Sequence, residues 1–520
     1  MKKTLLLIGL FSLCVGNTFS QKPDKGLQQI TPSILKQYID YLASDSLMGR
    51  NTPSPELDIA ADFIAAQFES FGIKKVNGSY FQEIPFCSKN LDNNSCHFTI
   101  SKDDDLKSFN LKTDYIPFKI TGDTAVIGNI VFAGYGITAP EYNYDDYKEI
   151  DAKGKIVLVF KEEPGEEDKN SPFNGIQITK HSYLETKVQN AIEHGAVGLL
   201  LVNGPLTHIW LKPQGYPWPS LSKFLPQDNL PIELCVQSRN YIPVVHIGEG
   251  VVKHLFNSID SLKNIQKIID STYQPFSFPI PDYKCNLKTQ TKTNTLIAKN
   301  VIGYIDGRNK KMKNELVVIG GHYDHVGYIR NHKQGEDYIF NGADDNASGT
   351  AGVLAVAKAF SSMKKSPKRS ILFILFAGEE KGLLGSDYYV DNPLFPLNKT
   401  VVMLNLDMIG RNGEDTMEIT GVKQNPDLCK IIFKENEKIG LKQTVGKEDL
   451  FGRSDHYNFY KKNISAVDIS SGLHNDYHTV RDNPNTINFI KATKISKLTF
   501  RTAWVVANEK KYYKTQNTEK

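Results

Sequence analysis

The sequence predicts an α/β protein: a mostly parallel, mixed sheet sandwiched by helices, with a smaller β-rich domain inserted into it. From about residue 297 onward, short apolar runs alternate with helical patterns, which is typical of parallel strands joined by crossover helices. Between residues 121 and 280 a second set of short apolar runs has a different spacing. A chain of 520 residues is also long enough for two or three domains.

The composition excludes several classes of protein. Hydrophobic residues make up 40% of the chain and charged residues 23%, as in ordinary globular domains. The formal net charge is only +4, with no long run of lysines, which argues against a nucleic-acid partner. No segment after the N-terminal signal has the roughly 18 uninterrupted apolar residues of a spanning helix. We therefore expect no transmembrane anchor.

The first 20 residues are typical of an export signal. Two lysines and an apolar stretch at residues 5–14 precede Thr18 and Ser20, which are small residues suited to a cleavage site before Gln21. We therefore predict that residues 1–20 are a signal peptide. The expected location is the periplasm or the medium of a bacterium.

Residues 21–120 and 281–510 are predicted to form the main domain, and residues 511–520 a flexible tail. Within it, residues 57–68 carry apolar side chains at three- and four-residue spacing, which marks the buried face of a helix. Strands are expected at three places: 316–320, 370–376 and 401–406. Helices are expected at 348–360 and 382–390 between them. Ligands of such sheets bind beyond the carboxyl ends of the strands.

Polar side chains cluster where each of these strands ends. His322 follows the first strand, Glu379 and Glu380 the second, and Asp407 the third, while Asp345 lies in the segment between the first two. Packed carboxylates repel one another unless a cation neutralises them, and imidazole with carboxylate suits zinc. There are too many ligands for one tetrahedral ion with an open position. Two ions that share a bridging carboxylate fit the number better.

Over about residues 295–500 the chain resembles the secreted leucyl-type aminopeptidases with a co-catalytic di-zinc site, which have the zinc-exopeptidase fold. Five separated motifs occur in the order of that family: residues 320–325, 341–349, 376–380, 404–410 and 476–479. The resemblance implies that five side chains hold two Zn²⁺ ions: His322, Asp345, Glu380, Asp407 and His478. Asp345 would bridge the two ions, and Glu379 would be the general base. Asp324 would orient His322.

Other residues near these motifs have less specific signals. Arg453 resembles an arginine of the family that helps to hold the substrate, and Tyr477 a tyrosine that stabilises the tetrahedral intermediate. Three further histidines, His325, His456 and His474, are not expected to be metal ligands. Of these, the last two could line the pocket.

The segment from 121 to 280 contains short strands around one helix. An apolar run at 155–160 predicts a strand, and a helical segment near 184–194 leads into an apolar run at 195–202. Together with residues 132–136, these segments resemble the protease-associated (PA) domain, which is commonly inserted into exopeptidases.

Five cysteines follow the signal, and export would permit disulfides. Cys87 and Cys96 are close in sequence and could close a small loop. An odd number leaves at least one thiol free. None of the cysteines forms a CxxC pair, so no cysteine is assigned to the metal site.

The resemblance implies a zinc-dependent aminopeptidase that acts on peptides with free N-termini, using a metal-activated water and Glu379. One alternative is a PA-containing carboxypeptidase of the glutamate-releasing type, although the usual helical domain has no room after about residue 507. A glutaminyl cyclase with one zinc is another alternative, but the ligand set here is complete. A third is a receptor-like binding protein that has lost catalysis, which would show as a missing ligand or base.

Overall fold

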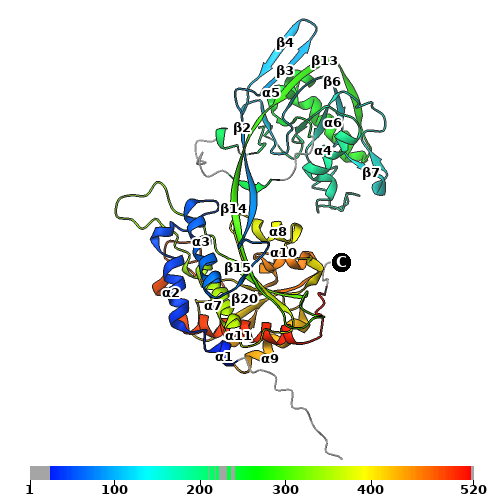
Figure 1. The fold of residues 1–520 in the computed structure, drawn as a ribbon. Coiled ribbons are helices and arrows are strands. Elements are labelled where there is room, and N and C mark those ends of the chain that lie inside the picture. The colour runs from blue at the N-terminus through cyan, green and yellow to red at the C-terminus, as the bar shows by residue number, and fades with distance from the viewer. Residues whose placement is uncertain (1–23, 209, 217, 222–230, 236–240, 517–520) are drawn as a thin grey trace, which may run out of the picture. The chain divides into compact units, whose positions relative to one another are not determined.

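The computed structural model describes residues 24–208, 210–216, 218–221, 231–235 and 241–516. The predicted signal peptide lies outside the described residues. The chain divides into two compact units. Unit 1 comprises the residues up to Pro85 together with those from Ile297 onward, and unit 2 comprises Phe86–Leu296. Strands β2 (Phe81–Leu91) and β14 (Thr291–Ile305) carry the chain from unit 1 to unit 2 and back (Figure 1).

The large sheet is mixed, with a parallel centre. From β14 to its far edge the strand order is β14-β16-β15-β17-β20-β18-β19. Its other strands have these bounds: β15 Leu316–His322, β16 Ser370–Phe376, β17 Thr400–Leu406, β18 Thr416–Thr420, β19 Lys442–Val445 and β20 Ser465–Ser470. The four central strands run parallel, whereas β14 and β18 are antiparallel to their central neighbours. The predicted mostly parallel, mixed sheet is thus confirmed.

Helices cover both faces of this sheet. On one face, Leu372 of β16 packs in a cluster with Tyr389 of α8 (Leu384–Asp391) and Phe459 of α10 (His456–Lys461). The next residue, Phe373, points to the opposite face and contacts Phe360 of α7 (Gly349–Ser361). Because both faces are covered, β16 and most of β15 and β17 are apolar, which made these strands visible in the sequence.

The helices of unit 1 have these bounds: α1 Asp24–Leu27, α2 Pro32–Leu42, α3 Pro55–Ser70, α7 Gly349–Ser361, α8 Leu384–Asp391, α9 Pro426–Asn436, α10 His456–Lys461 and α11 Phe489–Asn508. The start of α3 illustrates the local chemistry: Ser54 accepts a hydrogen bond from the backbone N–H of Leu57, and Pro55 occupies the first turn. None of the described helices is both long enough and apolar enough to cross a bilayer.

Unit 2 is built on an eight-stranded sheet with the order β4-β3-β13-β6-β9-β10-β12-β5. Its strands have these bounds: β3 His97–Lys102, β4 Asp105–Phe109, β5 Tyr115–Pro117, β6 Thr124–Ala133, β9 Ile156–Phe160, β10 Gly198–Val202, β12 Val244–Ile247 and β13 Ser277–Thr289. Three helices flank it: α4 Leu184–Glu193, α5 Glu249–Phe256 and α6 Ile259–Thr272. The remaining strands are short: β1 Lys74–Lys75, β7 Thr138–Ala139, β8 Tyr144–Asp145 and β11 Ile232–Leu234.

The boundaries of unit 2 differ from the predicted domain limits of 121 and 280. Strands β3 and β4 precede residue 121, yet β3 pairs with β13, which in turn pairs with β6. This pairing across more than 150 residues of sequence draws residues 86–120 and 281–296 into unit 2.

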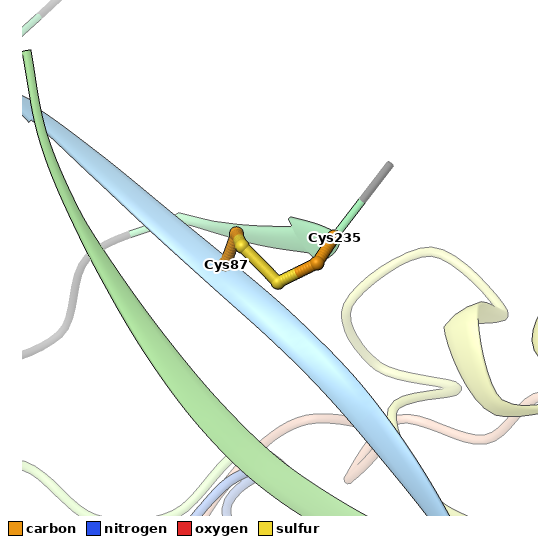
Figure 2. Close-up of a disulfide and its surroundings, with 2 residues drawn as sticks. All are labelled: Cys87 and Cys235. Carbon is orange, nitrogen blue, oxygen red and sulfur yellow. A yellow bond between two sulfur atoms is a disulfide. The ribbon is translucent and has the colours of Figure 1, made fainter. Parts of the chain in front are cut away.

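The disulfide of unit 2 joins Cys87 to Cys235 (Figure 2). The expected Cys87–Cys96 loop is therefore wrong. Strand β2 pairs with β11 so that Cys87 lies opposite Glu233, which brings Cys235 close. The thiol of Cys96 instead accepts a hydrogen bond from the backbone N–H of Gln290.

The residues that follow α11 are packed as far as the structure describes them. Tyr513 is buried, the N–H of Gln516 donates to the carbonyl of Gln424, and Lys511 pairs with Asp427. Residues 511–516 therefore differ from the flexible tail that the sequence predicted.

Candidate metal centre

The carboxyl ends of three neighbouring parallel strands bring the first candidate ligands together. His322 is the last residue of β15 and lies opposite Phe376, the last residue of β16. Glu380 follows β16 by four residues, and Asp407 follows β17 directly. Because the strands end in register, the side chains that follow them lie close together.

Asp345 lies in the buried segment Ala343–Ser348 before α7, where its own backbone angles are not helical (φ −102°, ψ 97°). The carboxylate of Asp482 accepts hydrogen bonds from the backbone N–H groups of Asp344 and Asp345, at 3.0 Å each. At the start of α7, Gly349 lies so close to the end of β17 that a Cβ there would come within 2.2 Å of the Leu406 carbonyl oxygen. These contacts hold Asp345 against the strand ends.

The first group of candidate ligands is centred on His322. Its Nε2 lies 3.3 Å from Oδ1 of Asp345 and 3.3 Å from Oδ1 of Asp407. On the other side of the ring, Nδ1 lies 3.2 Å from the backbone oxygen of Asp324. The hydroxyl of Ser454 donates to Oδ2 of Asp407 at 2.8 Å, which leaves Oδ1 directed at His322.

The second group is centred on His478. Its Nε2 lies 3.1 Å from Oδ2 of Asp345 and 3.1 Å from Oε2 of Glu380. His478 has a φ of +53°, which is uncommon for a residue other than glycine. Its loop is held by Asp476, whose carboxylate pairs with Arg411 at 2.6 Å.

Asp345 belongs to both groups through different oxygens. Its Oδ1 faces His322, whereas its Oδ2 faces His478. Nitrogen and oxygen atoms of each group lie within 4.8 Å of one another and could hold a metal ion. The donor set therefore suits two ions with one shared carboxylate.

His325, which was not expected to be a metal ligand, also lies among the side chains of the second group. Its Nδ1 lies 2.9 Å from Oε1 of Glu380 and 3.7 Å from Oδ2 of Asp345, and the residue is fully buried. Its N–H donates to the carbonyl of Arg50. The only signal in the sequence was its position three residues after His322, at the end of the same strand.

Arg50 is a second residue that the sequence did not reveal. Its buried guanidinium donates to the backbone oxygens of Tyr323, Asn341 and Gly342 at 2.8–3.0 Å. Burial lowers the pKa of Arg50 to about 10, although the nearby carboxylate of Asp324 opposes this shift. Arg50 therefore joins the loops that carry His322 and Asp345, and it supplies positive charge beneath them.

The histidines and carboxylates of the two groups shift one another's pKa values. Burial opposes ionisation of Asp345, but His325, His322 and His478 outweigh it and hold its pKa well below the usual range. Burial alone would lower the pKa of His478, yet Asp345 and Glu380 raise it to about 10. The opposite charges of these histidines and carboxylates attract one another and hold the two ligand groups together.

Glu379 lies beside the first group without belonging to its closest contacts. Its Oε2 is 3.9 Å from Nε2 of His322, and its N–H donates to Oδ1 of Asp324 at 3.3 Å. Burial raises the pKa of Glu379 well above the usual range, and the charges of Asp407 and Glu380 add to this rise. Asp324 thus contacts both the ring of His322 and the backbone of Glu379.

A cavity opens beside these side chains. It is lined by Glu379 and by the first ligand group, and also by Arg453 and Tyr477. The ring of Tyr477 stacks on that of His478, with 3.9 Å between their centroids. Both residues that the sequence proposed for substrate contact therefore face this cavity.

The two other histidines near the motifs lie elsewhere. His456 is buried against Phe451. His474 is buried with its Nε2 3.5 Å from Oδ2 of Asp344. Neither is among the residues that line the cavity, which differs from the expectation that they could do so.

Both units contain segments that match known protein families. Residues 300–503 match peptidase family M28, and residues 123–255 match the PA domain. Over 212 residues the chain is 32% identical to aminopeptidase YwaD of Bacillus subtilis (strain 168), covering 38% of this chain and 42% of that protein. Over 169 residues it is 31% identical to leucine aminopeptidase 2 of Trichophyton equinum, covering 31% of each. The chain thus spans less than half the length of these curated relatives.

A solved structure, the aminopeptidase from Aneurinibacillus sp. strain AM-1, is similar over 94% of this chain and 97% of its own, with a TM-score of 0.49 and 19% sequence identity. The PA match lies within unit 2, and both ligand groups lie within the segment that matches the peptidase family. The chain is therefore similar to peptidase family M28 through residues 300–503 and to the PA domain through residues 123–255.

Proposed function

We propose that the protein is a zinc-dependent aminopeptidase that hydrolyses the N-terminal peptide bond of peptides with free N-termini. The observation that carries this proposal is that the two carboxylate oxygens of Asp345 face two separate ligand groups. His322 and Asp407 would hold one Zn²⁺, and Glu380 and His478 the other. The names of the matched relatives, an aminopeptidase and a leucine aminopeptidase, support the same class of reaction.

Bound zinc would lower the pKa of water and polarise the scissile carbonyl. Glu379 is the general base in this proposal, because it lines the cavity beside His322 and its carboxylate forms no ion pair shorter than 3.9 Å with a described residue. Its raised pKa suits a group that accepts a proton near neutral pH and returns it to the leaving amine.

Two residues would act on the substrate itself. The hydroxyl of Tyr477 is proposed to donate to the oxyanion that develops from the carbonyl, and burial keeps it protonated by raising its pKa. Arg453, which lines the same cavity, is also proposed to contact the substrate. Asp324 is proposed to orient His322. Export to the periplasm or the medium stays a prediction from residues 1–20.

The test compares aminoacyl-anilides with N-blocked peptides, before and after chelation and zinc restoration. We expect cleavage of free-amine substrates alone, loss of activity on chelation and recovery with zinc. Glu379→Gln is expected to lower kcat about 10²- to 10⁴-fold, whereas Glu414→Gln, at an exposed position outside the cavity, keeps activity. Cleavage of blocked peptides with free carboxyl ends would instead support the carboxypeptidase alternative. Bound zinc without any hydrolysis would support a cyclase or a binding protein.

A further inference from the structure

The cavity beside Glu379 contains two carboxylates that the proposed chemistry does not use. They belong to Glu418 of β18 and Asp468 of β20. The antiparallel register places Thr420 opposite Asp468 and Glu418 opposite Ser470. Residues directly opposite one another, and residues two apart on one strand, point to the same face of a sheet. Both carboxylates therefore lie on the face of the sheet that forms the cavity wall.

Neither carboxylate is neutralised by a cation of the described chain. Glu418 is half-buried, and its side chain makes no hydrogen bond or ion pair with any described residue. Asp468 is only 7% exposed; its Oδ1 accepts a hydrogen bond from Asn405 at 2.9 Å, and no described donor reaches its Oδ2. Arg453 lines the same cavity, but it forms no ion pair with either within the described chain. Buried charges are costly unless they are paired, so this pair favours a cationic ligand.

The carboxylate of Glu418 has open surroundings. Glycines flank it, and a Cβ on Gly446 would lie 3.1 Å from its Oε1, while one on Gly472 would lie 3.4 Å from its Oε2. Because these positions have no side chains, space remains beside the carboxylate for an incoming group. The same lining includes the apolar side chains of Met408, Leu450 and Leu473, beside the hydroxyl groups of Thr420 and Ser470.

We propose that this cavity selects peptides whose N-terminal residue is lysine or arginine. The methylene stem would lie along Met408, Leu450 and Leu473, because long cationic side chains bury their stems on apolar surface while the charged head finds polar partners. The ammonium or guanidinium head would then pair with Glu418 and Asp468. This inference rests on the proposed function. The cavity can accept the side chain of the substrate's N-terminal residue only if the bond cleaved beside Glu379 is the N-terminal peptide bond.

The test compares lysyl-anilide with norleucyl-anilide, whose side chain has a similar stem without the charge. We expect kcat/KM to be at least about 10-fold higher for the lysyl substrate, as for a charge-assisted hydrogen bond. Arginyl-anilide should behave like the lysyl substrate, and glutamyl-anilide should be cleaved more slowly than both. Glu418→Gln is expected to lower the lysyl-to-norleucyl ratio about 10-fold. The control is Glu414→Gln, which lies on the same segment of the chain as Glu418 but outside the cavity. It should leave the lysyl-to-norleucyl ratio unchanged.

Asp468→Asn provides a second variant, and both substitutions lowering the ratio would support the inference. A wild-type ratio near one, or a ratio that neither substitution changes, would overturn it while leaving the aminopeptidase proposal in place. If no free-amine anilide is cleaved at all, the proposed function itself fails, and this inference fails with it.

Discussion

At the scale of single residues, His325 shows the limit of motif-based reasoning. The sequence placed His322, Asp345, Glu380, Asp407 and His478 near one rim, and the structure brings all five together. His325 and Arg50 could not be assigned in that way. The contacts of both residues form because loops distant in sequence meet. The periodicity of strands does not predict how such loops meet.

The contact between His325 and Glu380 leads to a prediction about metal affinity. His325→Ala removes the nitrogen that lies 2.9 Å from Oε1 of Glu380. Because a partner that holds a ligating carboxylate typically contributes 10- to 100-fold in metal affinity, we expect about that loss at one of the two proposed zinc sites. Zinc titration with a competing chelator measures it. The matched control is His332→Ala at an exposed histidine, and an equal loss there would contradict the account.

His246 in unit 2 leads to a prediction about acid stability. It is buried, and burial lowers its pKa to about 3. A histidine whose folded pKa is depressed contributes stability above its unfolded pKa of about 6.5 and loses it as the pH falls. We expect the free energy of unfolding of unit 2 to fall by about 1.4 kcal/mol per pH unit below 6.5 from this group.

Urea unfolding at pH 7 and pH 5.5, followed by a probe in unit 2, tests this expectation. His246→Gln, whose side-chain oxygen can replace Nδ1 as the acceptor from Gln214, should be less sensitive to this change of pH than the wild type. Identical pH dependence in both proteins would show that His246 is not responsible.

At the scale of elements, the strands were predictable where both of their faces are buried. The predicted strand at 370–376 coincides with β16, and the helix at 348–360 differs from α7 by one residue at each end. The limits of unit 2 were not predictable, because β4 is short and largely exposed and β3 pairs with the distant β13. The disulfide partner of Cys87 was missed for the same reason, since it depends on the pairing of β2 with β11.

The junction of α7 with β17 leads to a prediction about folding. Gly349→Ala would place a Cβ 2.2 Å from the carbonyl oxygen of Leu406, which is backbone and cannot move freely. We expect the free energy of unfolding to fall by about 1–3 kcal/mol or more, as for other overpacked sites. Gly452→Ala is the control, because its nearest contact would be 3.8 Å away. Chemical denaturation of the two variants should therefore differ, and equal stability would contradict this packing.

At the scale of the whole molecule, each of the two units contains a segment that matches a different family. The predicted insertion of a PA domain into a peptidase is confirmed by the matches at residues 123–255 and 300–503. All residues assigned to the chemistry lie in unit 1, within residues 322–478. The sequence therefore predicted which side chains gather at the strand ends, since strand ends of a parallel sheet converge, but it did not indicate the acidic wall formed by Glu418 and Asp468.

The central claim is that two zinc ions, joined by Asp345, support hydrolysis of peptides with free N-termini. The most direct measurement restores zinc stepwise to the chelated protein and follows hydrolysis of lysyl-anilide against equivalents of zinc per chain. We predict no activity without metal and full activity at two equivalents, with N-blocked substrate uncut throughout. Activity that saturates at one equivalent, or that survives chelation, would contradict the account.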